Sequence, residues 1–190
     1  MNVQPLSLHG AALLVQKPIA DNRGSFARTF CGRTLAEHGL SFRMAQCNEA
    51  FNKHARTLRG MHFQRPPHGE EKIVNCVQGK LYDVIVDLNL DSPTFGKWVG
   101  VTLSADDGQS LFVPKGFAHG YQTLTENTVI QYMVSEYYTP SHESGVRWND
   151  PFFGIEWPFT EDLLLSEKDR SWTDFDKMRD GIRLSEGVRT

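Results

Sequence analysis

Residues that could transfer protons are concentrated in the stretch Thr57–Val86. Here His62 and Lys72 stand at the two ends of a polar loop that interrupts apolar runs. The order of apolar runs, polar residues and a Gln-Gly turn predicts a strand, a loop, a second strand, a tight turn and a third strand. A rigid sheet would hold both side chains with little freedom, which suits a binding or catalytic site.

A second histidine follows an apolar run in the stretch Leu111–Gly120. The run ends in Pro114-Lys115-Gly116, which predicts a turn, and His119 comes just after that turn. We therefore expect His62 and His119 to lie at the ends of two strands and to face each other inside a small barrel.

Short apolar segments dominate the centre of the chain. β-Branched and aromatic residues recur between turn sequences from residue 58 to residue 138. This pattern predicts an all-β fold, either a jelly-roll barrel or a sandwich, and we favour the jelly roll. The expected strands span residues 73–77, 81–88, 98–103, 110–113 and 129–134.

The two ends of the chain carry weaker signals. We expect an edge strand within 1–20, strands at 25–30 and 41–48, and a short helix at 32–40 that Gly39 could end. Residues 161–170 and 173–183 fit short helices or an irregular tail, and 185–190 are expected to be disordered. We expect one domain over 1–190, with its core within 5–170 and a tail at 171–190.

The composition of the 190 residues excludes several classes of protein. A net charge of −3 with scattered Lys and Arg does not fit a nucleic-acid binder, and no apolar run is long enough to cross a membrane. The first residues lack the basic and apolar regions of a signal peptide, so we expect a cytoplasmic location. The widely spaced cysteines, Cys31, Cys47 and Cys76, are expected to be reduced thiols.

His62 and His119, together with Glu70 and Glu71 at the mouth of a jelly roll, could instead bind a metal ion. Metal-binding cupins carry His-x-His in their first motif, whereas this chain has His62-Phe63-Gln64. Glutamine is a poor ligand for transition metals beside imidazole, so we expect no metal and no other cofactor. His68 is expected to be only an exposed loop residue.

The motifs of the chain resemble those of the dTDP-4-dehydrorhamnose 3,5-epimerase family, the metal-free cupins of deoxysugar biosynthesis. The resemblance runs in order along the chain from residue 5 to residue 170. It implies a jelly roll, a homodimer and an isomerase that acts on a nucleotide sugar. The matching segments are 21–26 (DNRGSF), 58–64 (LRGMHFQ), 79–84 (GKLYDV), 91–98 (DSPTFGKW), 114–120 (PKGFAHG), 147–151 (RWNDP), 154–158 (GIEWP) and 165–169 (LSEKD).

The resemblance also implies a reaction and its catalytic residues. The substrate would be a nucleotide-linked 4-keto-6-deoxyhexose, most simply the dTDP sugar, whose ketone makes the hydrogens on C3 and C5 weakly acidic. His62 would be the base, Asp169 the carboxylate that orients it, and Lys72 the cation that stabilises the enolate. Tyr132 would return a proton from the opposite face and so invert the carbon. Without the resemblance, Lys72 and Asp169 could be surface charges and Tyr132 a core aromatic.

Further residues are candidates for substrate binding. Arg23 and Arg28 flank the expected strand at 25–30, where guanidinium groups could grip a phosphate. The side chains of Gln46 and Asn48 point to one face of their strand. The resemblance implies binding roles for Arg23, Phe26, Gln46, Asn48, Arg59, His119 and Tyr138.

Three positions depart from the family pattern, in which an aromatic, a glutamate and an acid are usual. They are Ser25, Arg28 and Cys47. These departures leave open the nucleotide, dTDP or CDP, and the exact sugar. A relative that inverts only one of the two carbons is a further alternative. Two other classes are a metal-binding cupin such as a dioxygenase and a non-catalytic sugar-binding cupin.

Overall fold

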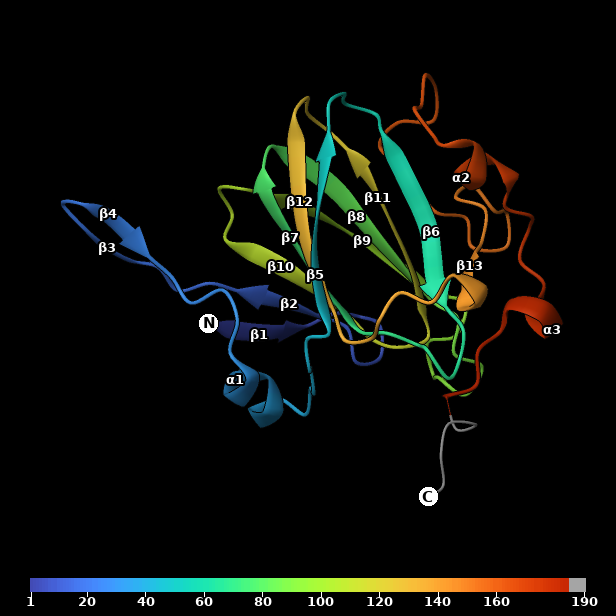
Figure 1. Cartoon of the computed structure of the whole chain (residues 1–190), viewed down its shortest axis with the longest axis horizontal. Coiled ribbons are helices and arrows are strands. Elements are labelled where there is room, and N and C mark those ends of the chain that lie inside the picture. The colour runs from blue at the N-terminus through green and yellow to red at the C-terminus, as the bar shows by residue number, and fades with distance from the viewer. Residues whose placement is uncertain (185–190) are drawn as a thin grey trace.

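Two antiparallel sheets that face each other form the body of the computed structural model, which describes residues 1–184 (Figure 1). They confirm the predicted all-β jelly roll. In spatial order, the six-stranded sheet contains β1 (Asn2–Pro5), β2 (Ala12–Val15), β10 (Gln109–Val113), β7 (Lys72–Gln78), β12 (Thr128–Val134) and β5 (Gln46–Asn52). The five-stranded sheet contains β13 (Glu143–Gly145), β6 (Leu58–Gln64), β11 (Phe117–Thr123), β8 (Lys80–Asp87) and β9 (Trp98–Ser104).

Strand β8 shows why the central apolar runs form this fold. Leu81 and Ile85 belong to the core between the sheets, whereas Val84 and Val86 pack on the outer face of the five-stranded sheet. Successive side chains of a strand point to opposite faces, so a strand covered on both faces needs a continuous apolar run. All five strands predicted for the centre of the chain are confirmed. Among residues 1–184, no helix has the length and apolar character needed to cross a membrane.

Strand β11 was not among the predicted strands. All seven of its residues are buried, although its sequence, FAHGYQT, alternates neither in polarity nor in size. Gly120 allows β11 to pass close to β6, because a Cβ atom there would lie 2.7 Å from the sulfur of Met61. Close backbone approach therefore replaces the apolar pattern that usually marks a central strand.

The N-terminal region differs from prediction at several boundaries. Residues 1–20 hold two paired strands, β1 and β2, and not a single edge strand, because the chain turns back at Gly10, which has φ +78°. Strand β5 begins at Gln46 and not at residue 41, since its pairing with β12 begins there. The predicted short helix is confirmed as α1 (Gly32–Glu37), and Leu35 packs it against the outer face of the six-stranded sheet.

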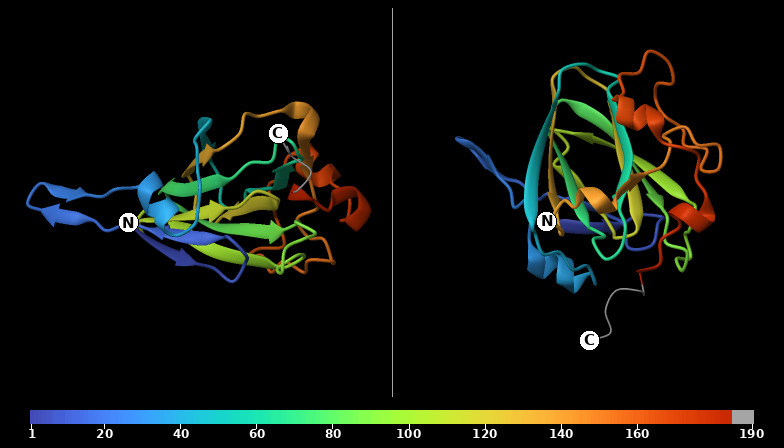
Figure 2. Two further views of the ribbon diagram at one scale, coloured as in Figure 1. Left: turned by 90° about the horizontal axis from the view of Figure 1, so that it is seen from below. Right: turned by 45° about the vertical axis from the view of Figure 1, so that its right-hand side comes forward.

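A separate hairpin projects from the body. It consists of β3 (Ile19–Asp21) and β4 (Gly24–Phe26), which form a two-stranded sheet of their own. Both figures show it extending away from the two large sheets (Figures 1 and 2). The strand predicted at 25–30 thus ends at Phe26. The side chains of Ile19 and Phe26 are 74% and 71% exposed, so the hairpin presents apolar surface that its own chain does not cover.

The C-terminal segment covers the outer face of the five-stranded sheet. Phe153 and Trp157 join the buried cluster on that face. The two predicted helical regions are mostly irregular and contain two short helices, α2 (Glu167–Ser171) and α3 (Lys177–Asp180). A short 3₁₀ helix, Pro140–His142, precedes β13. The prediction of disorder for 185–190 concerns residues outside the described part of the chain.

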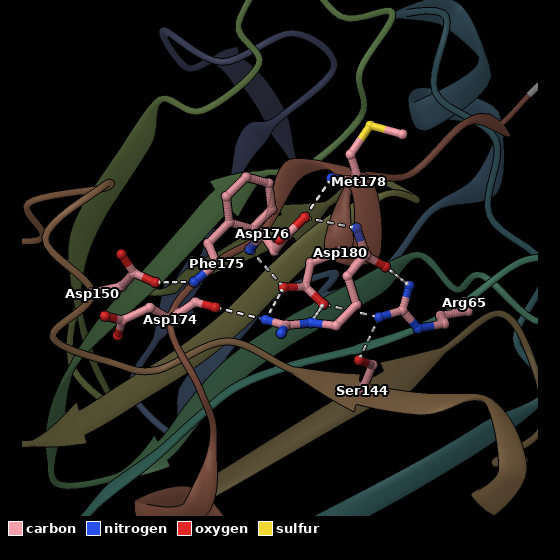
Figure 3. Close-up of polar contacts among 9 residues, drawn as sticks. Arg65, Ser144, Asp150, Asp174, Phe175, Asp176, Met178 and Asp180 are labelled. Atoms are coloured by element: carbon pink, nitrogen blue, oxygen red, sulfur yellow. Dashed lines mark hydrogen bonds and ion pairs between the residues drawn. The ribbon is translucent and has the colours of Figure 1, made fainter.

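Helix α3 is held against the end of β6 by Asp180 (Figure 3). The carboxylate of Asp180 accepts hydrogen bonds from Arg65, at 3.1 Å, and from Arg179, at 2.7 Å. Arg65 directly follows β6 and also donates to the carbonyl oxygen of Arg179, at 2.6 Å, and to Ser144 Oγ, at 3.1 Å. Burial raises the pKa of Asp180, but the two arginines and the backbone N–H of Asp176 outweigh it and lower that pKa below its ordinary value.

We expect Asp180→Asn to lower the free energy of unfolding at neutral pH by about 1–3 kcal/mol, because Arg65 and Arg179 lose a charged acceptor that is itself buried. Asp180 has a folded-state pKa below its unfolded-state pKa. Its contribution is therefore present above the unfolded pKa and is lost as the pH falls through the folded pKa. The deficit of the variant should shrink on acidification from pH 6 to pH 3, as measured by urea unfolding. Asp106→Asn, at an exposed turn, is the control. An equal deficit at every pH would contradict this account.

Candidate active site

A cavity of about 430 Å³ opens between the two sheets. A smaller cavity of about 210 Å³ adjoins it and shares three lining residues, His62, Lys72 and Tyr132. Both sheets contribute to the walls: β6 and β11 from one, and β5, β7 and β12 from the other. The larger cavity is lined by Gln46, Asn48, His62, Phe63, Gln64, Glu70, Lys72, Tyr132, Val134, Tyr138 and Glu143.

His62 is paired with Asp169. His62 Nε2 lies 2.5 Å from Asp169 Oδ1, although the two residues are 107 positions apart in sequence. The second carboxylate oxygen accepts a hydrogen bond from the hydroxyl of Ser166, the N-cap of α2, at 2.9 Å. Asp169 is 3% exposed, so it is not a surface acid. Burial raises its pKa, but the hydrogen bonds from His62 and Ser166 and the charge of His62 lower it below its ordinary value and keep it ionised.

A second histidine–carboxylate pair lies beside the first. His119 and His62 are partners in the β11–β6 register, and both line the smaller cavity. The two histidines therefore meet inside the jelly roll, as expected, but as neighbours within two adjacent strands of one sheet and not at strand ends that face each other. His119 Nε2 lies 2.5 Å from Asp83 Oδ1, and Asp83 is fully buried on the neighbouring strand β8.

Lys72 lies inside the cavity at the start of β7. It is 9% exposed, so the surface-charge alternative is wrong. Its ammonium group is 2.9 Å from Glu70 Oε1. Glu70 Oε2 in turn accepts a hydrogen bond from Gln64 Nε2, at 3.2 Å. The lysine charge is therefore held in place by the loop that precedes its strand.

Tyr132 stands on the wall opposite the histidines. It belongs to β12 of the six-stranded sheet, whereas His62 belongs to β6 of the five-stranded sheet. Its ring packs against the core between the sheets, and its edge borders both cavities. Burial and the charge of Glu70 raise the pKa of Tyr132, while Arg59 lowers it, with a net increase. A phenol with a raised pKa keeps its proton and can donate it.

The predicted amide pair is confirmed in position. Gln46 and Asn48 both line the larger cavity from β5. Gln46 Oε1 accepts a hydrogen bond from the backbone N–H of Tyr138, at 2.8 Å, and the hydroxyl of Tyr138 donates to Glu143, at 2.7 Å. These contacts form one rim of the cavity. In the smaller cavity, Arg59 donates to Asn52 Oδ1, at 3.0 Å.

Three of the candidate binding residues do not reach this cavity within one chain. Arg23 and Phe26 lie on the projecting hairpin, and Arg28 is exposed just after it. Arg23 forms an ion pair with Asp21, at 2.6 Å, at the turn of the hairpin. The physical reason is that the hairpin pairs only with itself, so it has no sheet register to bring it to the cavity.

Sequence reasoning missed the roles of several residues in and around the cavity. Gln64, judged only as a poor metal ligand, donates to the carbonyl oxygens of His68 and Tyr137 and accepts from the backbone N–H of Thr139, at 2.6 Å. His68 is not an exposed loop residue: it is partly buried and its ring centroid is 4.5 Å from that of His142. Glu143 carries no sequence signal, since it comes from a short edge strand.

The residues at the cavity do not form an evident metal site. Within residues 1–184, no three His, Cys, Asp or Glu side chains are grouped so that they could hold a metal ion. Both ends of the Gln64 amide are engaged by hydrogen bonds, and the ring Nε2 atoms of His62 and His119 face carboxylates. The cysteines are unpaired, as predicted, and only Cys76 is buried.

Comparison with known proteins gives a consistent result. Residues 5–177 match the model of the dTDP-4-dehydrorhamnose 3,5-epimerase family. The family member from Methanothermobacter thermautotrophicus is 42% identical over 169 residues, which is 87% of this chain and 90% of that protein.

Solved structures agree with the sequence matches. The Bacillus anthracis enzyme of the same name, with TDP and PPi bound, is 42% identical with a TM-score of 0.88, and the match covers 92% of this chain and 99% of that one. A 3'-monoepimerase from Streptomyces bikiniensis, in complex with dTDP-quinovose, is 34% identical with a TM-score of 0.83, over 90% and 86% of the two chains.

Proposed function

Because this chain belongs to the dTDP-4-dehydrorhamnose 3,5-epimerase family and is therefore an isomerase, we propose that it inverts C3 and C5 of dTDP-4-dehydro-6-deoxyglucose in deoxysugar biosynthesis. One observation carries the proposal. His62, paired with Asp169, and the Tyr132 phenol stand on facing sheets around one cavity, and the Lys72 ammonium is part of the same lining. Inversion of a carbon requires a proton acceptor on one face of the sugar and a proton donor on the other.

The reaction follows from these four groups. His62 takes the proton from C3 or C5, and the electrons of the C–H bond move into the C4 carbonyl to give an enolate. The ammonium of Lys72 stabilises the negative enolate oxygen. Tyr132 then gives its hydroxyl proton to the opposite face of the same carbon, and the C4 carbonyl re-forms. Solvent takes the proton from the His62 imidazolium and returns one to the Tyr132 phenolate. Asp169 fixes the orientation of the imidazole and stabilises its protonated form.

The hairpin supports a homodimer. Arg23 and Phe26 match substrate-binding positions of the family, yet they lie away from the cavity of their own chain on an exposed apolar hairpin. We propose that the hairpin fills this role in the site of a second copy. Sedimentation equilibrium should then give the mass of a dimer. Mixing refolded Arg23→Ala and His62→Ala chains, each of low activity alone, should restore activity, because some hybrid dimers contain one intact site. A monomeric mass would overturn the proposal.

The deciding test is exchange in deuterated water. We propose incubation with dTDP- and CDP-4-keto-6-deoxyglucose, followed by NMR location of the deuterium. Deuterium at both C3 and C5 of the dTDP sugar, with inversion at both, is the expected result. Inversion at only one carbon would assign a monoepimerase, the activity named for the Streptomyces bikiniensis relative. Exchange with the CDP sugar alone would reassign the nucleotide.

Activity is expected to survive dialysis against EDTA. The carbonyl oxygen of the Gln64 amide accepts from Thr139, and its NH₂ group donates to Glu70, so neither is directed at a metal. The assay should be run with metal analysis of the same sample before and after dialysis. Loss of activity that returns with Mn²⁺, Fe²⁺ or Zn²⁺ would show a metal-dependent enzyme.

We also propose that residues 1–190 form one domain and that the enzyme is cytoplasmic. The second point is supported by three unpaired thiols, which are usual in a reducing compartment. Fractionation of cells that produce the protein tests it directly.

A further inference from the structure

Trp172 packs against His62 of the His62–Asp169 pair. It is the residue that follows α2, three positions after Asp169. Its ring and the imidazole of His62 meet edge to face, with centroids 6.4 Å apart and an interplanar angle of 66°. The indole therefore contacts the imidazole and also belongs to the short segment that carries the carboxylate.

The place of the indole depends on Gly145. Gly145 is the register partner of His62 in the β13–β6 pair. A Cβ atom at position 145 would lie 2.4 Å from an indole carbon of Trp172. Any side chain there would displace the ring. The glycine thus leaves a space beside His62 that Trp172 fills.

What the indole offers to His62 is its ring and not its N–H. Trp172 Nε1 has no hydrogen-bond partner among residues 1–184, although the atom is shielded from solvent. The carboxylate of Asp169 accepts from His62 on one oxygen and from Ser166 on the other. The carboxylate is therefore held by these two groups, and the indole packs beside the imidazole.

The segment that carries Trp172 is tied to β6 at both ends. At one end, Asp169 contacts His62, and at the other end Asp180 contacts Arg65, the residue that follows β6. Between them, the backbone N–H of Phe175 donates to Asp150 (Figure 3). These contacts leave the indole little freedom to move away from His62.

We propose that Trp172 is a positioning residue: its ring, which fills the space beside Gly145, holds the imidazole of His62 in the orientation that Asp169 sets. Arg59 and Lys72 line the cavity with His62, and Glu143 beside them is already paired with Lys168. The proposal rests on the role of His62 as the base. Trp172 itself touches no reacting atom.

The test compares Trp172→Phe, which keeps a ring and loses the N–H, with Trp172→Ala, which loses both. Trp98→Phe is the control, because Trp98 is a partly buried tryptophan on β9, at the opposite edge of the same sheet from β13. One readout is the chemical shift of the His62 ring protons, assigned from the spectrum of His62→Ala. This readout requires no turnover, so it remains informative if the proposed reaction fails. The other readout is kcat together with KM.

In Trp172→Ala, the imidazole loses the ring that packs against it. The His62 ring signals should shift, and kcat should fall by about 10²-fold with little change in KM. Trp172→Phe keeps an aromatic ring in the same space, so it should recover most of this loss and stay within about tenfold of the wild-type kcat. A folded Trp172→Ala protein whose His62 signals and kcat match those of Trp98→Phe would overturn the proposal, and so would a Trp172→Phe variant no more active than Trp172→Ala.

Discussion

Substitution of His62 by alanine should remove deuterium exchange at the sugar carbons almost completely. A positioned general base contributes about 10²–10⁴ in rate, and no other imidazole occupies its place, since His119 faces Asp83. Asp169→Ala should have a similar but smaller effect, because the imidazole remains but loses the carboxylate that orients it at 2.5 Å. Exchange is measured by NMR with the dTDP sugar in deuterated water.

The matched control is His38→Ala. His38 is an exposed histidine at the end of α1 whose ring contacts only the carbonyl oxygen of Thr34 among the described hydrogen bonds. This variant should exchange at the wild-type rate. If His62→Ala also exchanges at that rate while it remains folded, His62 is not the base, and His119 becomes the residue to test next.

The second large effect separates exchange from inversion. In Tyr132→Phe, His62 can still remove the substrate proton and Lys72 can still stabilise the enolate. The imidazolium can then return a proton to the same face, so the starting sugar acquires deuterium without changing its configuration. Inversion should fall by about 10²–10⁴, far more than exchange, because only the acid on the opposite wall is lost. The ring remains, so the core around it should stay packed.

One sample gives both quantities for this variant, since NMR reports the position of deuterium and the configuration of each carbon. Tyr137→Phe is the control, because Tyr137 is 65% exposed and its hydroxyl makes no described hydrogen bond. Equal loss of exchange and inversion in a folded Tyr132→Phe protein would mean that Tyr132 is not a separate acid. Tyr138, which also borders the larger cavity, is then the next candidate.

The sequence predicts the inner strands well because burial on both faces, as in β8 and β10, leaves a continuous apolar run. His62 and His119 could be placed together because each lies where an apolar run meets a loop or a turn. Strand β11 escaped prediction because its close backbone packing depends on Gly120 and not on large apolar side chains.

Contacts between distant segments were beyond pattern analysis. Only the resemblance to a family suggested that Asp169 belongs with His62, because nothing local in Leu165–Asp169 indicates which strand α2 packs against. The hairpin was predicted to supply binding residues, and its sequence does not reveal that it projects from its own chain. The contact of Glu70 with Lys72 and that of Glu143 with Tyr138 were found only in the structure, since acids in loops and edge strands are usually solvated.

The separation of 107 positions between His62 and Asp169 has a consequence for synthesis and folding. As the chain leaves the ribosome, β6 emerges long before α2, so His62 exists for most of translation without the carboxylate that orients it. Pairing them requires closure of a very long loop, and contacts of this kind form late in folding. The outer face of the five-stranded sheet also stays open until the C-terminal segment arrives. A nascent or partly folded chain therefore lacks the His62–Asp169 pair, and we expect proton transfer to begin only after the C-terminal segment has docked.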